Sequence, residues 1–306
     1  MAELRRAAVI GTGTMGPGMG AVLARAGLET ALYDVSADAL ERARAGAELA
    51  AAVLDRLDAA QADGGSLRFE SDLGAALVGV DVVVEAVPEK LELKHDVFRR
   101  FEEHVSDDAI LASNTSGIPI TKIASVCRRP ERVVGMHWSN PPHLIPMIEV
   151  VPGEQTSDAT VEAVSELVRR VGYHPVVEKE VPGFVENRIL YAILRECLDL
   201  VDRGIVSPEG LDLNVRWGIG YKLAVIGPME LLDMAGLDIY DAVGSYLNQD
   251  LSTSGEVSST IRGLIDKGRL GMKTGGGIYD YTPEQIEELR ARRAGKLVGV
   301  RKALEA

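Results

Sequence analysis

The residues of this chain best suited to proton transfer are His137 and, twelve residues later, Glu149. His137 ends one apolar run and Glu149 lies within the next. An imidazole titrates near neutral pH, so it can take up or release a proton under ordinary conditions. General base catalysis of this kind contributes roughly 10²–10⁴-fold to a rate. A lone histidine near a strand end is usually structural, but the pairing with Glu149 favours a proton-transfer base.

A second functional cluster is the glycine-rich turn that follows the first apolar run and opens a helical pattern. Gly11 allows the tight turn, Gly13 lets the backbone approach a pyrophosphate, and Gly16 lets helix and strand pack closely. The phosphates would rest on the helix N-terminus, where free N–H groups favour negative charge. The pattern therefore predicts a dinucleotide site formed by Gly11, Gly13, Thr14, Met15 and Gly16.

Asp34 ends the next apolar run, 18 residues after Gly16. An acid at this position accepts hydrogen bonds from the adenosine ribose hydroxyls and repels a 2′-phosphate. The alternative is a capping aspartate before Ser36 and the helix that follows. We predict that the cofactor is NAD rather than NADP.

The elements that would position these residues are short apolar runs alternating with helical patterns, which is typical of a doubly wound α/β domain. Most runs are apolar on both faces, as buried parallel strands are. The last strands are expected to break the parallel order, because His137 and Met147 are joined by a proline-rich loop too short for a helical crossover. The expected strands are Ala7–Ile10, Thr30–Tyr33, Val82–Ala86, Ala109–Ser113, Val133–His137, Met147–Val151 and Pro175–Val177.

The pattern changes at Pro182-Gly183, which we predict to be the domain boundary. Residues 1–181 would form a Rossmann-type domain, and residues 182–306 an all-α domain for substrate binding and dimerisation. Phe184–Asp202 has the apolar spacing of one amphipathic helix, and the signals after it are helical.

The bulk composition excludes several functions. The net charge of −13 disfavours nucleic acid and anionic membranes as partners. No apolar run approaches the roughly 18 residues of a membrane span, and residues 1–6 are too short for a signal peptide. The two cysteines, Cys127 and Cys197, lack the spacing of metal ligands, so we predict no metal site and a cytoplasmic location.

Five motifs in order resemble one family. They are 113–116 (SNTS), 137–142 (HWSNPP), 182–188 (PGFVENR), 227–233 (GPMELLD) and 273–279 (KTGGGIY). Together with Glu149 they are similar to the 3-hydroxyacyl-CoA dehydrogenase family over nearly the whole chain. The resemblance implies an NAD-dependent dehydrogenase with a helical dimerisation domain, and hence a homodimer.

The resemblance also implies catalytic roles. His137 would take the alcohol proton while hydride leaves the carbon, and Glu149 would hold the imidazole and stabilise its charged form. Ser116 and Asn187 would hydrogen-bond the reacting oxygen. For Asn187 the alternative is a helix N-terminal residue, since asparagine favours such positions.

The same resemblance places further residues against the cofactor. Glu89, Lys94, Ser116 and Asn140 match positions that touch its ribose and nicotinamide side in the family. Lys94 has a plain alternative as a solvated charge on a helix.

Two departures from the CoA enzymes bear on the substrate. The segment Val35–Ser66 has no lysine and carries three arginines against six acidic residues, which would repel a CoA phosphate. The longer stretch Gly218–Pro228 contains Lys222, which would bind a free carboxylate or be an exposed helix lysine. Trp138 would offer an aromatic wall to a ring or belong to the core.

Three functions remain open at this stage. The first is an NAD-dependent dehydrogenase for the alcohol or hydrated aldehyde of a small carboxylate, such as a pyridine aldehyde. The second is an L-3-hydroxyacyl-CoA dehydrogenase acting on CoA thioesters. The third is a non-catalytic NAD-binding or structural relative, which the presence of His137, Glu149, Ser116 and Asn187 disfavours.

Overall fold

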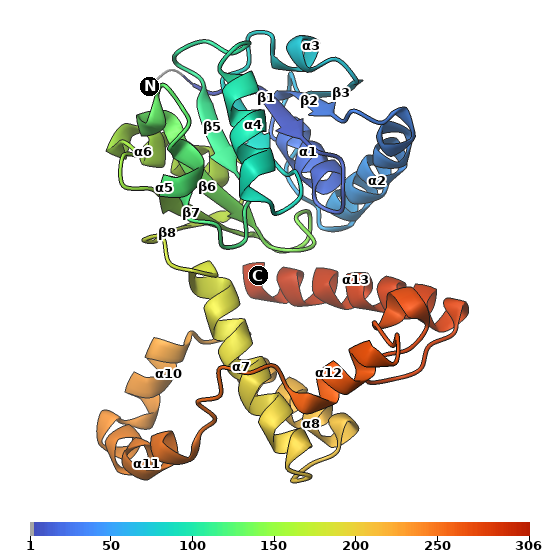
Figure 1. Cartoon of the computed structure of the whole chain (residues 1–306), viewed down its shortest axis with the longest axis vertical. Helices are drawn as coiled ribbons and strands as arrows, with labels where there is room; N and C mark the ends of the chain where they lie inside the picture. The colour runs from blue at the N-terminus through green and yellow to red at the C-terminus, as the bar shows by residue number, and fades with distance from the viewer. Residues whose placement is uncertain (1–2) are drawn as a thin grey trace. The chain divides into compact units, whose positions relative to one another are not determined.

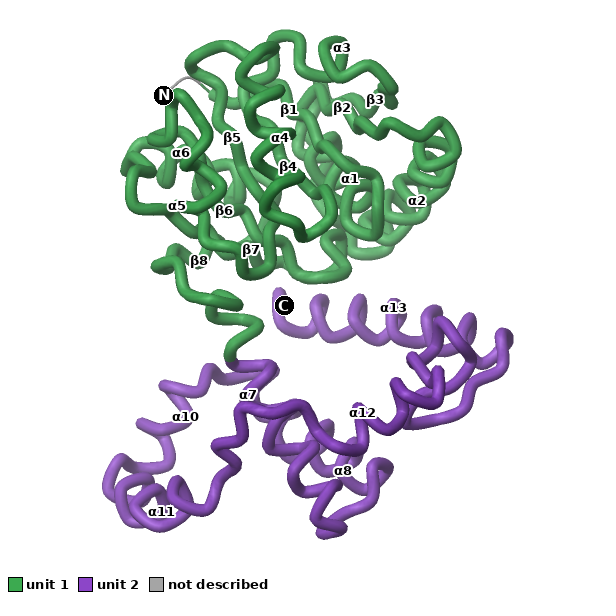
Figure 2. The backbone as a smooth tube through the Cα atoms, viewed as in Figure 1, with its two compact units in different colours: residues 1–188 green, residues 189–306 purple. Residues whose placement is uncertain are grey.

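The computed structural model describes residues 3–306. The chain forms two compact units (Figure 2): unit 1 ends at Arg188, and unit 2 is Ile189–Ala306. The boundary predicted between residues 181 and 182 lies shortly before this division, and helix α7 (Phe184–Asp202) runs across it.

Unit 1 is built on one eight-stranded sheet of order β3-β2-β1-β4-β5-β6-β7-β8 (Figure 1). All neighbouring strands are parallel except β6 and β7, which are antiparallel, so the predicted doubly wound sheet and the break in its parallel order are both confirmed. The strands are β1 Arg6–Ile10, β2 Glu29–Tyr33, β3 Ser66–Glu70, β4 Val82–Glu85, β5 Ile110–Ser113, β6 Val133–Trp138, β7 Met147–Pro152 and β8 His174–Val177.

Strand β3 was not predicted from the sequence. It is an edge strand with alternating polar residues, and only part of its surface is covered. An edge strand of this kind lacks the continuous apolar run that marks the buried strands.

Two apolar cores lie on opposite faces of the sheet. One contains side chains of helices α1 (Gly16–Arg25), α2 (Ala37–Arg56) and α6 (Asp158–Arg170). The other contains side chains of α3 (Leu73–Leu77), α4 (Leu91–Phe101) and α5 (Ile120–Ala124), the last followed by the 3₁₀ turn η1 (Pro130–Arg132). Because side chains alternate along a strand, neighbouring residues of β6 belong to different cores.

Unit 2 is entirely helical apart from isolated bridges near Gly271–Asp280, as predicted. Its elements after α7 are α8 Pro208–Asn214, the π-helix η2 Val215–Gly220, α9 Tyr221–Leu223, α10 Pro228–Ala235, α11 Leu237–Asp250, α12 Ser259–Asp266, the 3₁₀ turn η3 Met272–Thr274 and α13 Pro283–Glu305. Across residues 3–306, no helix combines the length and the apolar character needed to cross a bilayer.

Candidate functional site

The turn between β1 and α1 has the backbone geometry that its glycines predict. Gly11 has φ +106°, and a Cβ there would lie 2.6 Å from the carbonyl oxygen of Ala86. A Cβ on Gly16 would lie 2.2 Å from the carbonyl oxygen of Gly11. Both contacts are with backbone that cannot move aside, so the turn closes only with glycine at these positions.

Gly13 differs from the other two, because a Cβ there would meet nothing within 4 Å. The residue faces open space, which a ligand can fill. Helix α1 begins at Gly16, and its N-cap residue Met15 makes no side-chain capping bond, so the first N–H groups remain able to bind an anion. These features fit the pyrophosphate of a dinucleotide.

A cavity of about 600 Å³ adjoins this turn. Its lining combines the glycine-rich turn and the start of α1, Asp34, residues of α2 as far as Leu49 and the loop after β6. The lining residues are Thr12, Gly13, Thr14, Pro17, Gly18, Asp34, Ala39, Arg42, Gly46, Leu49, Pro141, Pro142 and His143.

Asp34 lies in this cavity as an ionised group. Its Oδ2 accepts the backbone N–H and the hydroxyl of Thr12 at 3.0 and 2.8 Å, and its Oδ1 accepts the N–H of Ser36 at 3.1 Å. Burial opposes ionisation, but these bonds outweigh it and lower the pKa of the Asp34 carboxyl. The helix cap is Ser36, whose hydroxyl accepts the N–H of Ala39, so capping does not explain Asp34.

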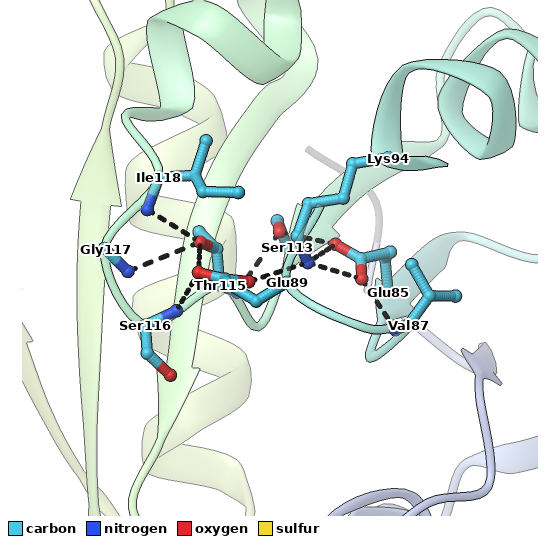
Figure 3. Close-up of polar contacts among 9 residues, drawn as sticks. All are labelled: Glu85, Val87, Glu89, Lys94, Ser113, Thr115, Ser116, Gly117 and Ile118. Atoms are coloured by element: carbon cyan, nitrogen blue, oxygen red, sulfur yellow. Dashed lines mark hydrogen bonds and ion pairs between the residues drawn. The ribbon is translucent and has the colours of Figure 1, made fainter. Parts of the chain in front are cut away.

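A buried ion pair anchors the loops at the carboxyl ends of β4 and β5 (Figure 3). The Lys94 ammonium lies 2.8 and 2.9 Å from the two oxygens of Glu85, and both side chains are almost completely buried. Ser113 Oγ and the N–H of Val87 also donate to Glu85, at 2.6 and 2.7 Å. Burial raises the pKa of Glu85, and the charge of Lys94 opposes that rise.

Glu89 connects this ion pair to the loop that carries Ser116 (Figure 3). Its Oε2 lies 3.2 Å from the Lys94 ammonium. Its Oε1 accepts the hydroxyl of Thr115 at 2.5 Å and the N–H of Ser116 at 3.0 Å. Lys94 is therefore not the solvated helix charge considered above. Its contacts in this structure are carboxylates, which makes it a support for Glu89.

His137 and Glu149 form a buried pair. They are direct partners in the antiparallel register of β6 and β7, so their side chains lie on the same face of the sheet. The distance from His137 Nδ1 to Glu149 Oε2 is 2.6 Å. The short loop between the strands fixes this register, and with it the pair.

The environment of Glu149 keeps it ionised. Its Oε1 accepts the N–H groups of Val185 and Glu186 at 3.0 and 2.6 Å. Burial opposes ionisation, but the bonds from His137 and these two N–H groups outweigh it, and the pKa of Glu149 is lowered. An ionised Glu149 accepts the Nδ1 proton of His137, which leaves Nε2 of the neutral ring free to take a proton.

The segment that supplies these N–H groups also packs on the imidazole. Phe184 is fully buried, and its ring centroid lies 5.6 Å from that of His137. Its φ of +51° is unusual for a residue with a side chain. Gly183 before it has φ +80°, and this turn directs the first N–H groups of α7 at Glu149.

The structure brings Ser116 and Asn187 together across 71 residues. Asn187 Nδ2 donates to the carbonyl oxygen of Ser116 at 3.3 Å. The hydroxyl of Ser116 makes no hydrogen bond to any described residue, and Ser116 is exposed. Asn140, near the start of the loop that leaves β6, is exposed as well.

The two tentative substrate residues have different surroundings. Trp138 is 1% exposed and packs edge-on against Tyr173, with ring centroids 5.9 Å apart. It follows His137 in β6 and points into the opposite core, so its contacts support the core alternative and not an aromatic wall. Lys222 is exposed on α9 of unit 2, and its carboxylate-binding role stays a prediction.

Sequence reasoning missed three residues beside the His137–Glu149 pair. The hydroxyl of Ser139 donates a very short hydrogen bond to Glu186, and Glu186 places a carboxylate oxygen within 4.8 Å of polar atoms of both members of the pair. Glu178 shares the N–H of Val185 with Glu149. Ser139 and Glu186 stood within the motifs at 137–142 and 182–188, but nothing in the sequence marked Glu178.

Two family models match consecutive parts of the chain. Residues 6–181 match the model of the 3-hydroxyacyl-CoA dehydrogenase NAD binding domain. Residues 183–281 match the model of the C-terminal domain of the same enzymes.

Individual relatives cover almost the whole chain. The 5-formyl-3-hydroxy-2-methylpyridine 4-carboxylate 5-dehydrogenase of Mesorhizobium japonicum is 54% identical over 99% of both chains. A solved structure of such an enzyme, described as an NAD+ dependent dismutase, superposes with a TM-score of 0.97 over 99% of both chains at 54% identity. The (S)-3-hydroxybutyryl-CoA dehydrogenase of Ralstonia eutropha is 32% identical, with a TM-score of 0.73 over 92% of this chain and 100% of that one.

Proposed function

This chain belongs to the 3-hydroxyacyl-CoA dehydrogenase family and is an NAD-dependent dehydrogenase, and we propose that its substrate is a pyridine aldehyde bearing a carboxylate. The substrate named for the relative that is 54% identical, 5-formyl-3-hydroxy-2-methylpyridine 4-carboxylate, is the specific candidate. The observation that carries the proposal is this identity over 99% of both chains in a protein that retains a buried His137–Glu149 pair.

We propose that His137 acts on the hydrated form of the aldehyde, a gem-diol. Its free Nε2 takes the proton of one hydroxyl as the C–H bond breaks, and that oxygen becomes the carbonyl oxygen of the acid. Glu149, ionised and held by two N–H groups, stabilises the imidazolium. NAD held at the glycine-rich turn would accept this hydride, and the NADH so formed would supply a hydride to an aldehyde in a separate reductive half-reaction.

We assign Ser116 and Asn187 to the reacting oxygen. The Ser116 hydroxyl is free of other hydrogen bonds within residues 3–306. A carboxamide nitrogen carries two hydrogens; the bond to Ser116 uses one of them, and the other remains for substrate. Glu89, supported by Lys94, holds the backbone of Ser116 in place.

We further propose that the chain carries out a dismutation. Two aldehyde molecules and one water would give one acid and one alcohol, with no net change in NAD. His137 takes a proton in the oxidative half and returns it to the alkoxide oxygen in the reductive half. The support is the description of the relative's solved structure as an NAD+ dependent dismutase.

The charge of α2 and the loop after it supports a small substrate over a CoA thioester. The segment Val35–Ser66 has three arginines, six acidic residues and no lysine. Such a surface repels the phosphates of CoA. The 3-hydroxybutyryl-CoA dehydrogenases are also the more distant relatives, at 36% identity for the Deinococcus radiodurans protein.

We propose that the protein works in the cytoplasm as a homodimer associating through unit 2. Helices of that unit expose many large apolar side chains, including Trp217, Met229, Met234, Leu237 and Tyr246. So many exposed apolar side chains in one helical unit support an association surface there. A monomeric mass in light scattering would refute the dimer.

The dismutation is tested with the aldehyde and a catalytic amount of NAD. Equal amounts of acid and alcohol, without build-up of NADH, are expected from the wild-type protein. The variant His137→Gln should bind NADH normally and form neither product. If the chain were a simple dehydrogenase, acid would form only up to the amount of NAD supplied, with an equal amount of NADH and no alcohol. That result would contradict the dismutation.

A further inference from the structure

We propose that Glu178 is a positioning residue of the catalytic site: it holds a proton, pairs with Glu149 and thereby sets the basicity of His137. The inference deepens the proposed function and rests on the role of His137 as base. It extends the pair of His137 and Glu149 to a chain of three titratable groups.

Glu149 and Glu178 accept a hydrogen bond from the same backbone N–H group. The backbone N–H of Val185 lies 3.0 Å from Glu149 Oε1 and 2.9 Å from Glu178 Oε1. Two carboxyl groups that share one donor are close neighbours, and Glu178 is in hydrogen-bonding reach of Glu149. Two carboxylates in one site cannot both ionise easily.

The second oxygen of Glu178 shows which group keeps the proton. Oε2 of Glu178 is buried and accepts no hydrogen bond from any described residue. Glu149, by contrast, accepts three bonds from donors. A carboxylate oxygen without donors is costly in a buried place, whereas a protonated oxygen can itself donate.

The charges around Glu178 point the same way. The titratable groups facing it are Glu149 on β7 and His137 on β6, with Glu186 on α7 bonded to Glu149. No lysine or arginine within residues 3–306 forms an ion pair with it. Burial, and then the charge of Glu149, raise the pKa of Glu178 to about 7.

The position of Glu178 is set by the sheet. Its N–H donates to the carbonyl oxygen of Val150 at 3.1 Å, which continues the pairing of β8 with β7 beyond Val177. Glu178 is thus held next to the strand that carries Glu149.

The consequence for catalysis has a definite sign. With Glu178 protonated, the carboxylates close to His137 are those of Glu149 and Glu186. Loss of the Glu178 proton adds a further negative charge, which stabilises the imidazolium and makes His137 a stronger base. The base should therefore strengthen as the pH rises past the pKa of Glu178.

The test is an NMR titration of the ¹⁵N-labelled His137 ring in the full-length protein, from about pH 5 to about pH 9, the range in which histidine titrates. The wild-type ring should show two inflections, its own and that of Glu178. In Glu178→Gln, which keeps size and a donor but cannot ionise, the second inflection should vanish. The basicity of His137 should fall by roughly threefold or more, because one nearby negative charge is gone.

Glu180→Gln is the matched control, because Glu180 is a carboxylate two residues away whose partner is the N–H of Thr121 at 2.9 Å. It should titrate as the wild type does. The acid limb of the kcat/KM profile should move to lower pH in Glu178→Gln and stay in place in Glu180→Gln.

A wild-type ring with one inflection, or identical His137 titrations in wild type and Glu178→Gln, would overturn the inference. The wild-type measurement decides it alone if the variant does not fold. Turnover that survives His137→Gln would refute the proposed function instead, while the ring titration would still report on the carboxyl pair.

Discussion

The side-chain amide of Asn187 is hydrogen-bonded to the main-chain carbonyl of Ser116 over 3.3 Å. The bond joins the first turn of α7 to the loop after β5. It uses one N–H of the amide, and the other remains for a further acceptor. In the proposed mechanism, a donor fixed in this way would meet the oxygen on which charge develops without rearrangement during the reaction.

Replacing Asn187 by alanine should therefore lower kcat more than it raises KM. Removal of one such donor costs roughly 10²-fold or more in kcat. Steady-state kinetics with the aldehyde and NAD give both constants, and an NADH titration should show unchanged cofactor affinity. A wild-type kcat in this variant would show that Asn187 does not bind the reacting oxygen.

Replacing Gly13 or Gly16 by alanine should have different effects on the stability of the protein. Gly16→Ala forces a Cβ to 2.2 Å from the carbonyl oxygen of Gly11, and overpacking of this kind costs about 1–3 kcal/mol. Gly13→Ala meets nothing within 4 Å, so its stability should change by less than about 0.5 kcal/mol.

Gly13→Ala, the more stable of the two variants, should show the specific loss of cofactor affinity. In Gly13→Ala the methyl group occupies the space offered to the pyrophosphate, and NADH should bind at least roughly tenfold more weakly. Urea unfolding and fluorescence titration measure the two quantities. Normal NADH binding by folded Gly13→Ala would show that the turn is not the phosphate site.

Removal of the buried Lys94 charge should destabilise unit 1. Lys94→Met leaves Glu85 buried without its cation, and breaking a buried pair costs about 3–5 kcal/mol. Lys90→Met, at an exposed residue of the same segment, should change stability by less than about 0.5 kcal/mol. Urea unfolding of both proteins makes the comparison, and equal midpoints would contradict it.

The double variant Glu85→Gln/Lys94→Met should recover part of the loss, because the fully buried carboxylate is then gone and only the partly exposed Glu89 lacks its cation. If it is less stable than Lys94→Met, the loss comes from packing and not from the unpaired carboxylate.

The stability of the protein should depend on the pKa of Glu178 in a defined window. Its pKa is raised from 4.5 to about 7 in the folded chain. The folded state therefore binds more protons than the unfolded state in this interval, and stability falls as the pH rises through it. Glu149 has a lowered pKa, so its contribution is present above about 4.5 and is lost as the pH falls further.

Glu178→Gln should accordingly be more stable than wild type above pH 7, and the difference should shrink towards pH 4.5. Urea unfolding at several pH values measures this, with Glu180→Gln as control. A difference that is constant with pH would show that Glu178 ionises normally.

The sequence was sufficient for the features that depend on local pattern. The buried strands have continuous apolar runs, and the turn at Gly11–Gly16 has backbone that only glycine allows, so both were predictable. The antiparallel break followed from the length of one loop. Strand β3 was missed because an edge strand is only partly covered.

The sequence predicted only those residues of the candidate site that lie in recognisable motifs. His137 and Glu149 were recognised, but their partners come from tertiary contacts. Glu178 lies 29 residues after Glu149 and meets it only through the pairing of β7 with β8. A lysine at this position of a helix looks the same in the sequence whether its side chain faces water or a buried carboxylate. The burial of Lys94 against Glu85 could therefore be seen only in the folded structure.

The orientation of Trp138 could have been predicted from the alternation of side chains along the strand. Side chains alternate along a strand, so His137 and Trp138 must point to opposite faces of the sheet. A catalytic His137 therefore implies a Trp138 that faces the other core, where the structure has it.

The proposed substrate specificity is tested most directly by comparing two substrates with one protein preparation. With NAD and 5-formyl-3-hydroxy-2-methylpyridine 4-carboxylate, kcat/KM should exceed about 10⁴ M⁻¹s⁻¹, an ordinary enzyme value. With NADH and acetoacetyl-CoA it should be at least roughly 100-fold lower, because the α2 segment repels CoA phosphates. The reverse order, with fast reduction of acetoacetyl-CoA and no turnover of the pyridine aldehyde, would contradict the proposed substrate.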